Sequence, residues 1–269
     1  MNKQVQFSNF LGKIISIYEA QTKKEELKSK RGGGDIITTL LIYALENKMI
    51  DKSLLVKMSE KEPWRAIPFI ARNKQEIITA SGSKYIFVPH KNYLTKLDSK
   101  SALVGLPCQI EICQNKNILK LGLFCGLNFS PRIINYLLKK TLCVKREDIL
   151  KVDYRAPYSK AFTVYLKNGE KKEIKGYSSL AYFFTNKKCI FCKDYTNHFA
   201  DISVGDRHLN WSAVIIRSNR GKYLFECAIK DGYIKANKIT KEDFLDNRMT
   251  PLMQKEKRGG FINTPLVRS

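Results

Sequence analysis

Hydrophobic positions along the central part of the chain follow a repeated order of strand, loop and helix. The mainly apolar run 36–48 follows a glycine-rich turn, which predicts a buried helix with Asp35 as its N-cap. Short apolar runs at 53–58, 101–105 and 119–125 predict strands. Helical patterns follow at 109–114 and, after Ser130-Pro131, at 132–140. Strands that alternate with helices in this way predict a parallel α/β arrangement.

The C-terminal half adds strands of a different kind. Apolar and polar residues alternate over 161–174 on both sides of Asn168-Gly169, which predicts a β-hairpin. Further strands are predicted at 200–204 and 211–216, and a helix at 222–230 that stops near Gly232. We therefore expect an α/β fold with a mixed, partly parallel sheet flanked by helices and an additional β-hairpin.

The two ends of the chain differ in character from its middle. Residues 1–30 are mostly one amphipathic segment that ends in a charged run, and they are predicted to form an N-terminal helical arm. Residues 251–269 are basic, contain Gly259-Gly260, and are predicted to form a flexible tail. With no internal repeat or low-complexity linker between these ends, residues 31–250 are predicted to form a single domain.

The composition is that of a globular protein, because 43% of the 269 residues are hydrophobic and 27% are charged. It excludes collagen-like, coiled-coil and wholly disordered chains. No stretch approaches the roughly 18 uninterrupted apolar residues of a membrane helix. Lys13 interrupts the apolar run 10–17, so no secretory signal is predicted either. We expect a cytoplasmic protein without a membrane span.

The charge balance is strongly basic. Lysine and arginine number 48 against 25 acidic residues, which gives a net charge of +23. Such an excess favours an anionic partner, namely nucleic acid, an acidic protein or a phosphorylated cofactor, although a lysine-rich solvated surface explains it equally well. The basic residues form no single stripe interleaved with aromatic residues, so the pattern gives nucleic-acid binding no support.

The seven cysteines indicate metal or redox chemistry. Cys189 and Cys192 form a Cys-x-x-Cys pair, which supplies half of a four-ligand site. Cys108 and Cys125 each lie at the carboxyl end of a predicted parallel strand. Neighbouring strands of this kind direct their C-terminal loops to the same crevice. These four cysteines are therefore candidate ligands of one centre, and an iron–sulfur cluster is one of the centres that they could form.

Other interpretations of the cysteines stay open on spacing alone. A single Cys-x-x-Cys pair also occurs in zinc knuckles and thioredoxin-like dithiols, and His198 and His208 are close enough in sequence to complete a mixed zinc site. Cys143 and Cys227 are predicted to be buried on apolar helix faces. Cys113 is a less favoured candidate ligand.

Several motifs, taken in order, resemble one known family: the beta subunit of the coenzyme F420-reducing hydrogenase, with its relatives among formate and other F420-dependent dehydrogenases. The resemblance extends from about residue 11 to about residue 232. The matching segments are Leu11-Gly12 to Ala20, the glycine-rich turn before residues 40–45, Gly82-Ser83-Lys84-Tyr85, Gly105-Leu106-Pro107-Cys108-Gln109, Gly122-Leu123-Phe124-Cys125-Gly126 with Ser130-Pro131, and the blocks 189–196, 200–206 and 211–217.

The resemblance implies a flavoprotein with FAD and a 4Fe-4S cluster, whose ligands carry over to Cys108, Cys125, Cys189 and Cys192. It implies an oxidoreductase subunit in which the cluster exchanges single electrons with FAD, and FAD exchanges a hydride with the deazaflavin of coenzyme F420. With only one Cys-x-x-Cys pair, the chain is not expected to activate hydrogen itself. Other oxidoreductase subunits or an acidic ferredoxin are the expected partners, and the basic surface suits both the ferredoxin and the anionic tail of F420.

Two segments are candidate FAD contacts within this resemblance. Gly33 and Gly34, with Thr38 in the helix that follows, can offer backbone amides and a helix N-terminus to the pyrophosphate. Ser83, Lys84 and Tyr85 match the family's Gly-Ser-Lys-Tyr motif, which implies donors for phosphate and an aromatic side chain for the ring. The chain departs from the family pattern at Asp35, where an acidic side chain would repel phosphate unless it caps the helix.

Three alternatives are kept. The same cofactors can serve ferredoxin or another acceptor instead of F420. A relative that keeps the fold and the cluster can have lost FAD. A zinc-stapled, basic nucleic-acid-binding module is the alternative of another class. Asp201 and Asp206 flank a short predicted strand, and structural hydrogen bonds are expected of them rather than catalysis.

Overall fold

The computed structural model describes residues 11–28, 35–155, 161–208 and 210–247. Gly33, Gly34 and the predicted tail at 251–269 lie outside these ranges. None of the helices in the described ranges is long and apolar enough to cross a membrane.

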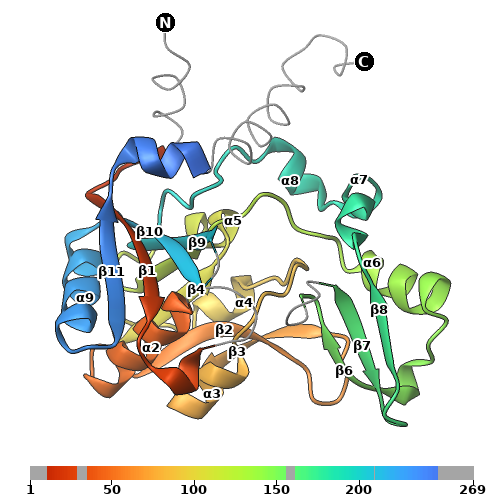
Figure 1. The fold of residues 1–269 in the computed structure, drawn as a ribbon. Coiled ribbons are helices and arrows are strands. Elements are labelled where there is room, and N and C mark those ends of the chain that lie inside the picture. Colours follow the sequence, from red (N-terminus) through yellow and green to blue (C-terminus); the bar gives the residue numbers. More distant parts are fainter. Residues whose placement is uncertain (1–10, 29–34, 156–160, 209, 248–269) are drawn as a thin grey trace, which may run out of the picture.

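Within the described residues, eight strands form one sheet in the order β11-β1-β10-β9-β5-β4-β2-β3 (Figure 1). The neighbours β2, β4, β5 and β9 are parallel, which confirms the partly parallel sheet expected from the sequence. Antiparallel strands extend it on both sides. The strands are β1 (Ser16–Thr22), β2 (Lys52–Met58), β3 (Ala66–Ala71), β4 (Ser101–Gly105), β5 (Leu119–Leu123), β9 (Ile202–His208), β10 (Trp211–Ile216) and β11 (Ile234–Ile239).

The parallel strands are buried on both faces, because successive side chains point to opposite sides of a sheet. Leu55 belongs to the core on the face covered by α2 (Ile36–Glu46) and α9 (Asn219–Lys230). Its neighbour Leu54 packs on the other side with Ile110 of α5 (Pro107–Glu111). Other short helical elements are η2 (Glu25–Leu27), α3 (Lys74–Thr79), α4 (Lys91–Leu94), η4 (Arg146–Asp148), η5 (Tyr177–Leu180), α7 (Ala181–Phe184) and α8 (Lys187–Phe191).

A second, three-stranded antiparallel sheet stands beside the first (Figure 1). It contains β6 (Ile149–Asp153), β7 (Phe162–Leu166) and β8 (Lys171–Ile174). β7 and β8 are the predicted hairpin, and Gly169 in their turn has a φ of +87°, which glycine adopts without strain. Its core packs against α6 (Arg132–Asn135) and the π-helix η3 (Tyr136–Thr141), which together replace the single predicted helix at 132–140.

The prediction of a helical arm is wrong for residues 16–22, which form strand β1 inside the large sheet. β1 pairs with β10 and β11, both about two hundred residues away in sequence. Ile17 and Ala20 pack into different cores. A short amphipathic run fits a helix as well as a strand, and here the long-range pairing decides.

Two cysteine predictions are also corrected. Cys143 is exposed rather than buried, because the helical stretch ends at Thr141 and Cys143 follows it with a φ of +52°. Cys227 lies on α9 as predicted, but it is only half-buried at the edge of the core.

Candidate functional site

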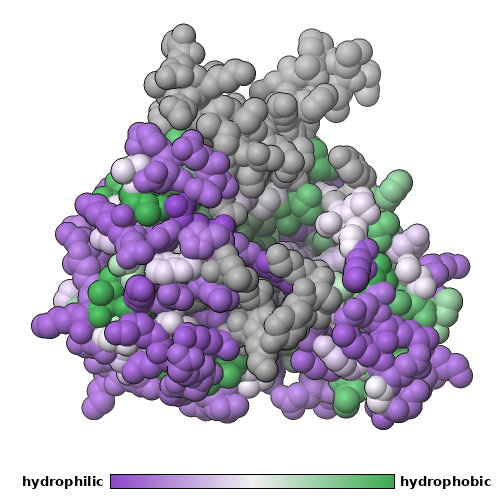
Figure 2. Space-filling view, viewed as in Figure 1, coloured by the Kyte–Doolittle hydropathy of each residue, from purple (hydrophilic) through white to green (hydrophobic). Residues whose placement is uncertain are grey.

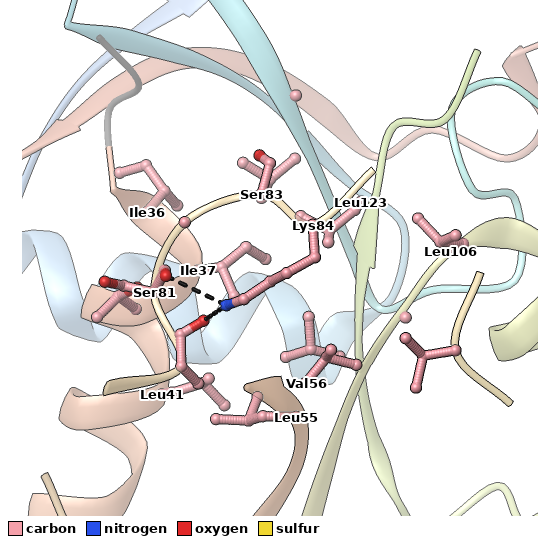
Figure 3. Close-up of a pocket in the computed structure, with 18 of the residues that line it drawn as sticks. Ile36, Ile37, Leu41, Leu55, Val56, Ser81, Ser83, Lys84, Leu106 and Leu123 are labelled. Atoms are coloured by element: carbon pink, nitrogen blue, oxygen red, sulfur yellow. Dashed lines mark hydrogen bonds between the residues drawn. The ribbon is translucent and has the colours of Figure 1, made fainter. Parts of the chain in front are cut away.

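A cavity of about 250 Å³ lies where the parallel strands end. Its wall includes Gly105 at the end of β4, Leu106 directly after it, Leu123 at the end of β5, and the first turn of α2. Figure 3 shows Ile36 and Ile37 of α2 with the loop 81–84 on one side, facing Leu106 and Leu123 on the other. This is the edge of an α/β sheet at which ligands usually bind.

Most of the residues in the wall of this cavity are apolar, and eleven are polar or charged. Such a lining suits a large, flat organic ligand that needs a small number of directed hydrogen bonds. The polar or charged residues that contribute to it are Asp35, Thr38, Ser81, Ser83, Lys84, His90, Gln109, Asn128, Arg155, Asp206 and Ser212.

The N-terminus of α2 forms one corner of the cavity. Asp35 occupies the predicted N-cap position, but with a left-handed backbone (φ 52°), and its side chain makes no capping hydrogen bond. The amides of the first helical turn have no partner within the helix, and these amides carry a partial positive charge. Thr38, one of the predicted FAD contacts, does line the cavity.

The Ser83–Lys84–Tyr85 segment is divided by the structure. Ser83 and Lys84 line the cavity, and the Lys84 ammonium donates to the carbonyl oxygens of Ala80 and Ser81 just after α3 (Figure 3). Lys84 thus holds its own loop in place beside the cavity. Tyr85 is not among the residues that line the cavity and packs against the core of the second sheet, so the structure does not bring it to the cavity with the other two.

Some residues of the wall carried no sequence signal of their own. Arg155 lies at the cavity and pairs with Asp206 at 2.6 Å, which agrees with the structural role expected of Asp206. His90 is 2% exposed, and burial lowers its pKa to about 4. Gln109, in contrast, stood within the recognised Gly-x-Pro-Cys-Gln segment.

Gln109 fixes the wall of the cavity near the cysteines. Its side-chain oxygen accepts a hydrogen bond from the amide of Leu106 at 2.9 Å, and its side-chain nitrogen donates to the carbonyl oxygen of Val88 at 2.7 Å. The first bond closes the turn before Cys108. The second binds the segment 88–90 to the helix that contains Cys108.

A second, smaller cavity is lined by all four candidate cysteine ligands. Cys108 lies in the first turn of α5, Cys125 follows β5, Cys189 is in α8 and Cys192 is its C-cap. Leu106 and Asn128 line both cavities, so the two share part of their wall. The structure therefore brings together the four cysteines that the sequence singled out and places them next to the large cavity. Cys113 is instead buried among Leu54, Leu103 and Ile118.

Hydrogen bonds connect the segments that contain these cysteines. The amide of Cys125 donates to the carbonyl oxygen of Tyr195 at 2.9 Å. The amide of Asn128 donates to the Cys189 sulfur at 3.4 Å, and the amide of Asn186 donates to the carbonyl oxygen of Asn128 at 3.0 Å. The loop after β5 and the segment around α8 are thus held against each other.

Asn197 joins the ends of β4 and β5 to the segment that follows α8. Its side-chain amide donates to the carbonyl oxygens of Gly105 (2.9 Å) and Leu123 (3.3 Å), the residues that end β4 and β5. The Asp194 carboxylate accepts from the Asn197 amide at 2.7 Å, which holds this residue near the Cys-x-x-Cys pair. At Gly122 a Cβ would lie 2.4 Å from Cγ of Asn197, so only glycine fits beside it.

The described residues contain no group of three or more His, Cys, Asp or Glu side chains that could hold a single metal ion. A zinc ion needs its ligands to meet within about 2.3 Å of one point, whereas the thiolates of a 4Fe-4S cluster bind separate irons. The zinc alternative finds no support in this part of the chain. His198 lies 3.4 Å from Asp194, and His208 lies 3.3 Å from Glu19, and neither lines the cysteine cavity. Ligation of a cluster by the four cysteines stays a prediction.

Gly205→Ala should destabilise the protein, because the added Cβ would lie 2.0 Å from the ring of Phe124. Phe124 precedes Cys125 and packs against Tyr195, so its displacement would disturb the cavity. We expect a loss of about 1–3 kcal/mol in the free energy of unfolding, measured by chemical denaturation. Gly126→Ala is the control, since a Cβ there meets nothing within 4 Å. Equal stability of the two variants would contradict the prediction.

Comparisons with known proteins agree on one family. Residues 98–242 match the family described as the C terminus of the coenzyme F420 hydrogenase/dehydrogenase beta subunit, and residues 17–95 match the family described as its N terminus. The coenzyme F420 hydrogenase subunit beta of Methanococcus voltae is 28% identical over 236 residues, which cover 81% of this chain and 82% of that protein.

Two further similar proteins are a formate dehydrogenase subunit and a solved hydrogenase chain. The F420-dependent formate dehydrogenase subunit beta of Methanocaldococcus jannaschii is 29% identical and covers 75% of this chain, which spans 56% of that longer protein. A solved chain of the F420-reducing [NiFe] hydrogenase complex from Methanosarcina barkeri superposes with a TM-score of 0.74 at 23% identity and covers 92% of each chain. At that identity the likeness to the solved chain establishes the fold.

Proposed function

Because the chain belongs to the coenzyme F420 hydrogenase/dehydrogenase beta subunit family, we propose that it is the iron–sulfur flavoprotein subunit of an F420-linked oxidoreductase complex. Cys108, Cys125, Cys189 and Cys192 would hold a 4Fe-4S cluster in the small cavity. The large cavity would hold FAD and admit coenzyme F420.

One observation carries this proposal. Four cysteines from three separate parts of the sequence line one cavity, and that cavity shares Leu106 and Asn128 with a large, mainly apolar one. Cysteine thiolates are the usual ligands of a 4Fe-4S cluster, and a mainly apolar cavity with a few polar groups is what a flavin ring requires. The shared wall makes the two sites neighbours.

When bound, the cluster supplies single electrons, and FAD links them to hydride exchange with F420. The chain itself supplies position and environment. The first-turn amides of α2 would bind the pyrophosphate, with Thr38 and Ser83 as further donors. Leu106 and Leu123 exclude water from the ring. The hydrogen bonds of Gln109 and Asn197 hold the turns that contain the cysteines in place.

Asp35 remains the departure from the family pattern in this site. Asp35 lines the cavity beside the α2 N-terminus, and its side chain makes no capping hydrogen bond. Exchange of Asp35 for serine should therefore strengthen FAD binding, because a negative charge is removed from the proposed pyrophosphate site. The affinity for FAD is measured by fluorescence titration at low and high salt. The difference in affinity between the wild type and the serine variant should be smaller at high salt. Weaker binding by the serine variant would contradict this placement of the pyrophosphate.

The proposed partners are other subunits of the complex or an acidic ferredoxin. The net charge of +23 favours an acidic partner and the anionic F420. Hydrophilic residues make up most of the coloured part of the face shown in Figure 2, with smaller apolar areas between them.

The test is to purify the protein without oxygen, record its absorption spectrum and analyse its metal and flavin content. We expect about four irons per chain and bound FAD. Reduced protein should then bleach the absorbance of oxidised F420. Bound FAD and iron without any change in F420 would favour ferredoxin as the acceptor. A colourless protein without iron or flavin would refute the proposal.

A further inference from the structure

His90 is a buried polar residue for which the fold itself provides no use. Its side chain is 2% exposed, and among the described residues neither Nδ1 nor Nε2 has a hydrogen-bond partner. Buried polar groups in folded proteins are almost always hydrogen-bonded, because an unpaired one loses its bonds to water without replacement. Two orphaned nitrogens on one side chain therefore require an explanation.

The position of His90 suggests what supplies the missing partner. His90 contributes to the wall of the large cavity, while its neighbours in that wall include the aliphatic residues Ile86 and Val88. It precedes α4 and belongs to a segment held in place by the bond between Gln109 and the carbonyl oxygen of Val88. The backbone around His90 is thus anchored, and the ring is held at the cavity.

The hydrogen bond from Gln109 to Val88 also indicates which end of the cavity His90 occupies. Gln109 follows Cys108 directly in sequence, and Leu106 beside it lines both cavities. His90 is therefore fixed on the side where the two cavities adjoin. The N-terminus of α2, the proposed pyrophosphate site, forms another part of the wall. A ligand that extends between the two would present its redox-active ring to His90.

The chemistry of the imidazole limits which kinds of ligand could pair with it. Burial favours the uncharged ring, which carries one N–H donor and one acceptor nitrogen. The polar edge of a flavin ring offers both carbonyl acceptors and an N–H donor. An aliphatic or purely hydrocarbon ligand would leave both nitrogens unpaired.

We propose that His90 binds and orients the flavin ring in the large cavity by a hydrogen bond to its polar edge. This inference rests on the proposed function, because it takes FAD as the occupant. His90 is then a positioning residue, which sets the affinity for the ring and its electronic environment while the cysteines hold the cluster.

The test compares His90→Leu and His90→Gln in the full chain from which flavin has been removed. FAD and FMN are titrated separately by flavin fluorescence, and ADP is titrated by calorimetry. We expect His90→Leu to weaken the binding of FAD and FMN about tenfold, the loss of one hydrogen bond, and to leave ADP unaffected. His90→Gln keeps a donor and an acceptor and should retain most of the affinity. The visible absorption bands of bound flavin should shift only in the leucine variant.

The thermal midpoint of the flavin-free protein provides a second readout. Leucine removes two unsatisfied buried nitrogens, so the flavin-free His90→Leu variant should melt no lower than the wild type. His208→Gln is the control for replacing a histidine, since His208 is exposed on β9 and lies outside the cavity lining. It should change neither affinity nor spectrum.

The outcomes separate this inference from the proposed function. If the wild type binds FAD and His90→Leu binds it equally well, the inference is wrong and FAD binding stands. If the leucine variant does not fold or melts far lower without flavin, His90 stabilises the flavin-free protein itself, and the inference is again wrong. If ADP binding weakens instead, His90 faces the adenine and not the ring. If the wild type binds no FAD, the proposed function fails as well.

Discussion

Replacement of Cys189 by serine should reduce the iron content of the anaerobically purified protein from about four atoms per chain to almost none. Cys189 lines the small cavity with Cys108, Cys125 and Cys192. A serine hydroxyl is a much poorer ligand for iron than a thiolate, and a cluster held by three thiolates is easily lost. The measurement is iron and sulfide analysis together with the visible absorption spectrum. Electron transfer to F420 should disappear with the iron.

Cys143→Ser provides the matched control for this experiment. Cys143 is exposed and does not line the cysteine cavity, so its replacement should leave iron, spectrum and activity unchanged. Retention of a full complement of iron by Cys189→Ser would refute the assignment of the cluster ligands. Loss of iron from both variants would point to general damage during purification rather than to ligation.

Replacement of Asn197 by alanine should cost about 3 kcal/mol of unfolding free energy. The carbonyl oxygens of Gly105 and Leu123 would lose their donor, and alanine would have to adopt the left-handed backbone of Asn197 (φ 68°). These carbonyls end the two strands that precede Cys108 and Cys125. The variant should therefore also release iron faster than the wild type on mild warming. Stability is measured by chemical denaturation of the protein without oxygen.

Asn210→Ala separates the two contributions to this loss. Asn210 has nearly the same backbone conformation (φ 62°), but it is exposed in the turn between β9 and β10. Its replacement should lower the free energy of unfolding by about 1 kcal/mol, the cost of placing alanine in the left-handed backbone conformation, and should leave the iron in place. If Asn197→Ala and Asn210→Ala have equal effects, the hydrogen bonds of Asn197 do not hold the cysteine-bearing turns together.

Much of the fold was predictable because the signals are local. The strand at 101–105 and the hairpin at 162–174 follow from side-chain periodicity and from a turn that needs glycine. The helix after the glycine-rich turn, Ile36–Glu46, follows from its length and apolar composition. β1 was predicted wrongly because its residues tolerate either conformation, and only its pairing with β10 and β11 makes it a strand.

The site was predictable where it follows from topology. Cys108 and Cys125 follow neighbouring parallel strands, so their convergence could be inferred before the structure was known. Tyr85 was selected by motif alone, and in the structure it packs against the core of the second sheet and does not line the cavity. No rule based on spacing could select His90 or Arg155, because each comes from a stretch without a motif.

The amino-acid sequence alone was enough to predict a sheet with parallel strands and four cysteines at its edge. It was also enough to indicate the family. It could do so because periodicity, strand direction and motif spacing are properties of short segments. The place of β1 in the sheet, the shared wall of the two cavities and the burial of His90 depend on contacts between residues far apart in sequence. Such contacts form only when the packed chain excludes water, so no local pattern contains them.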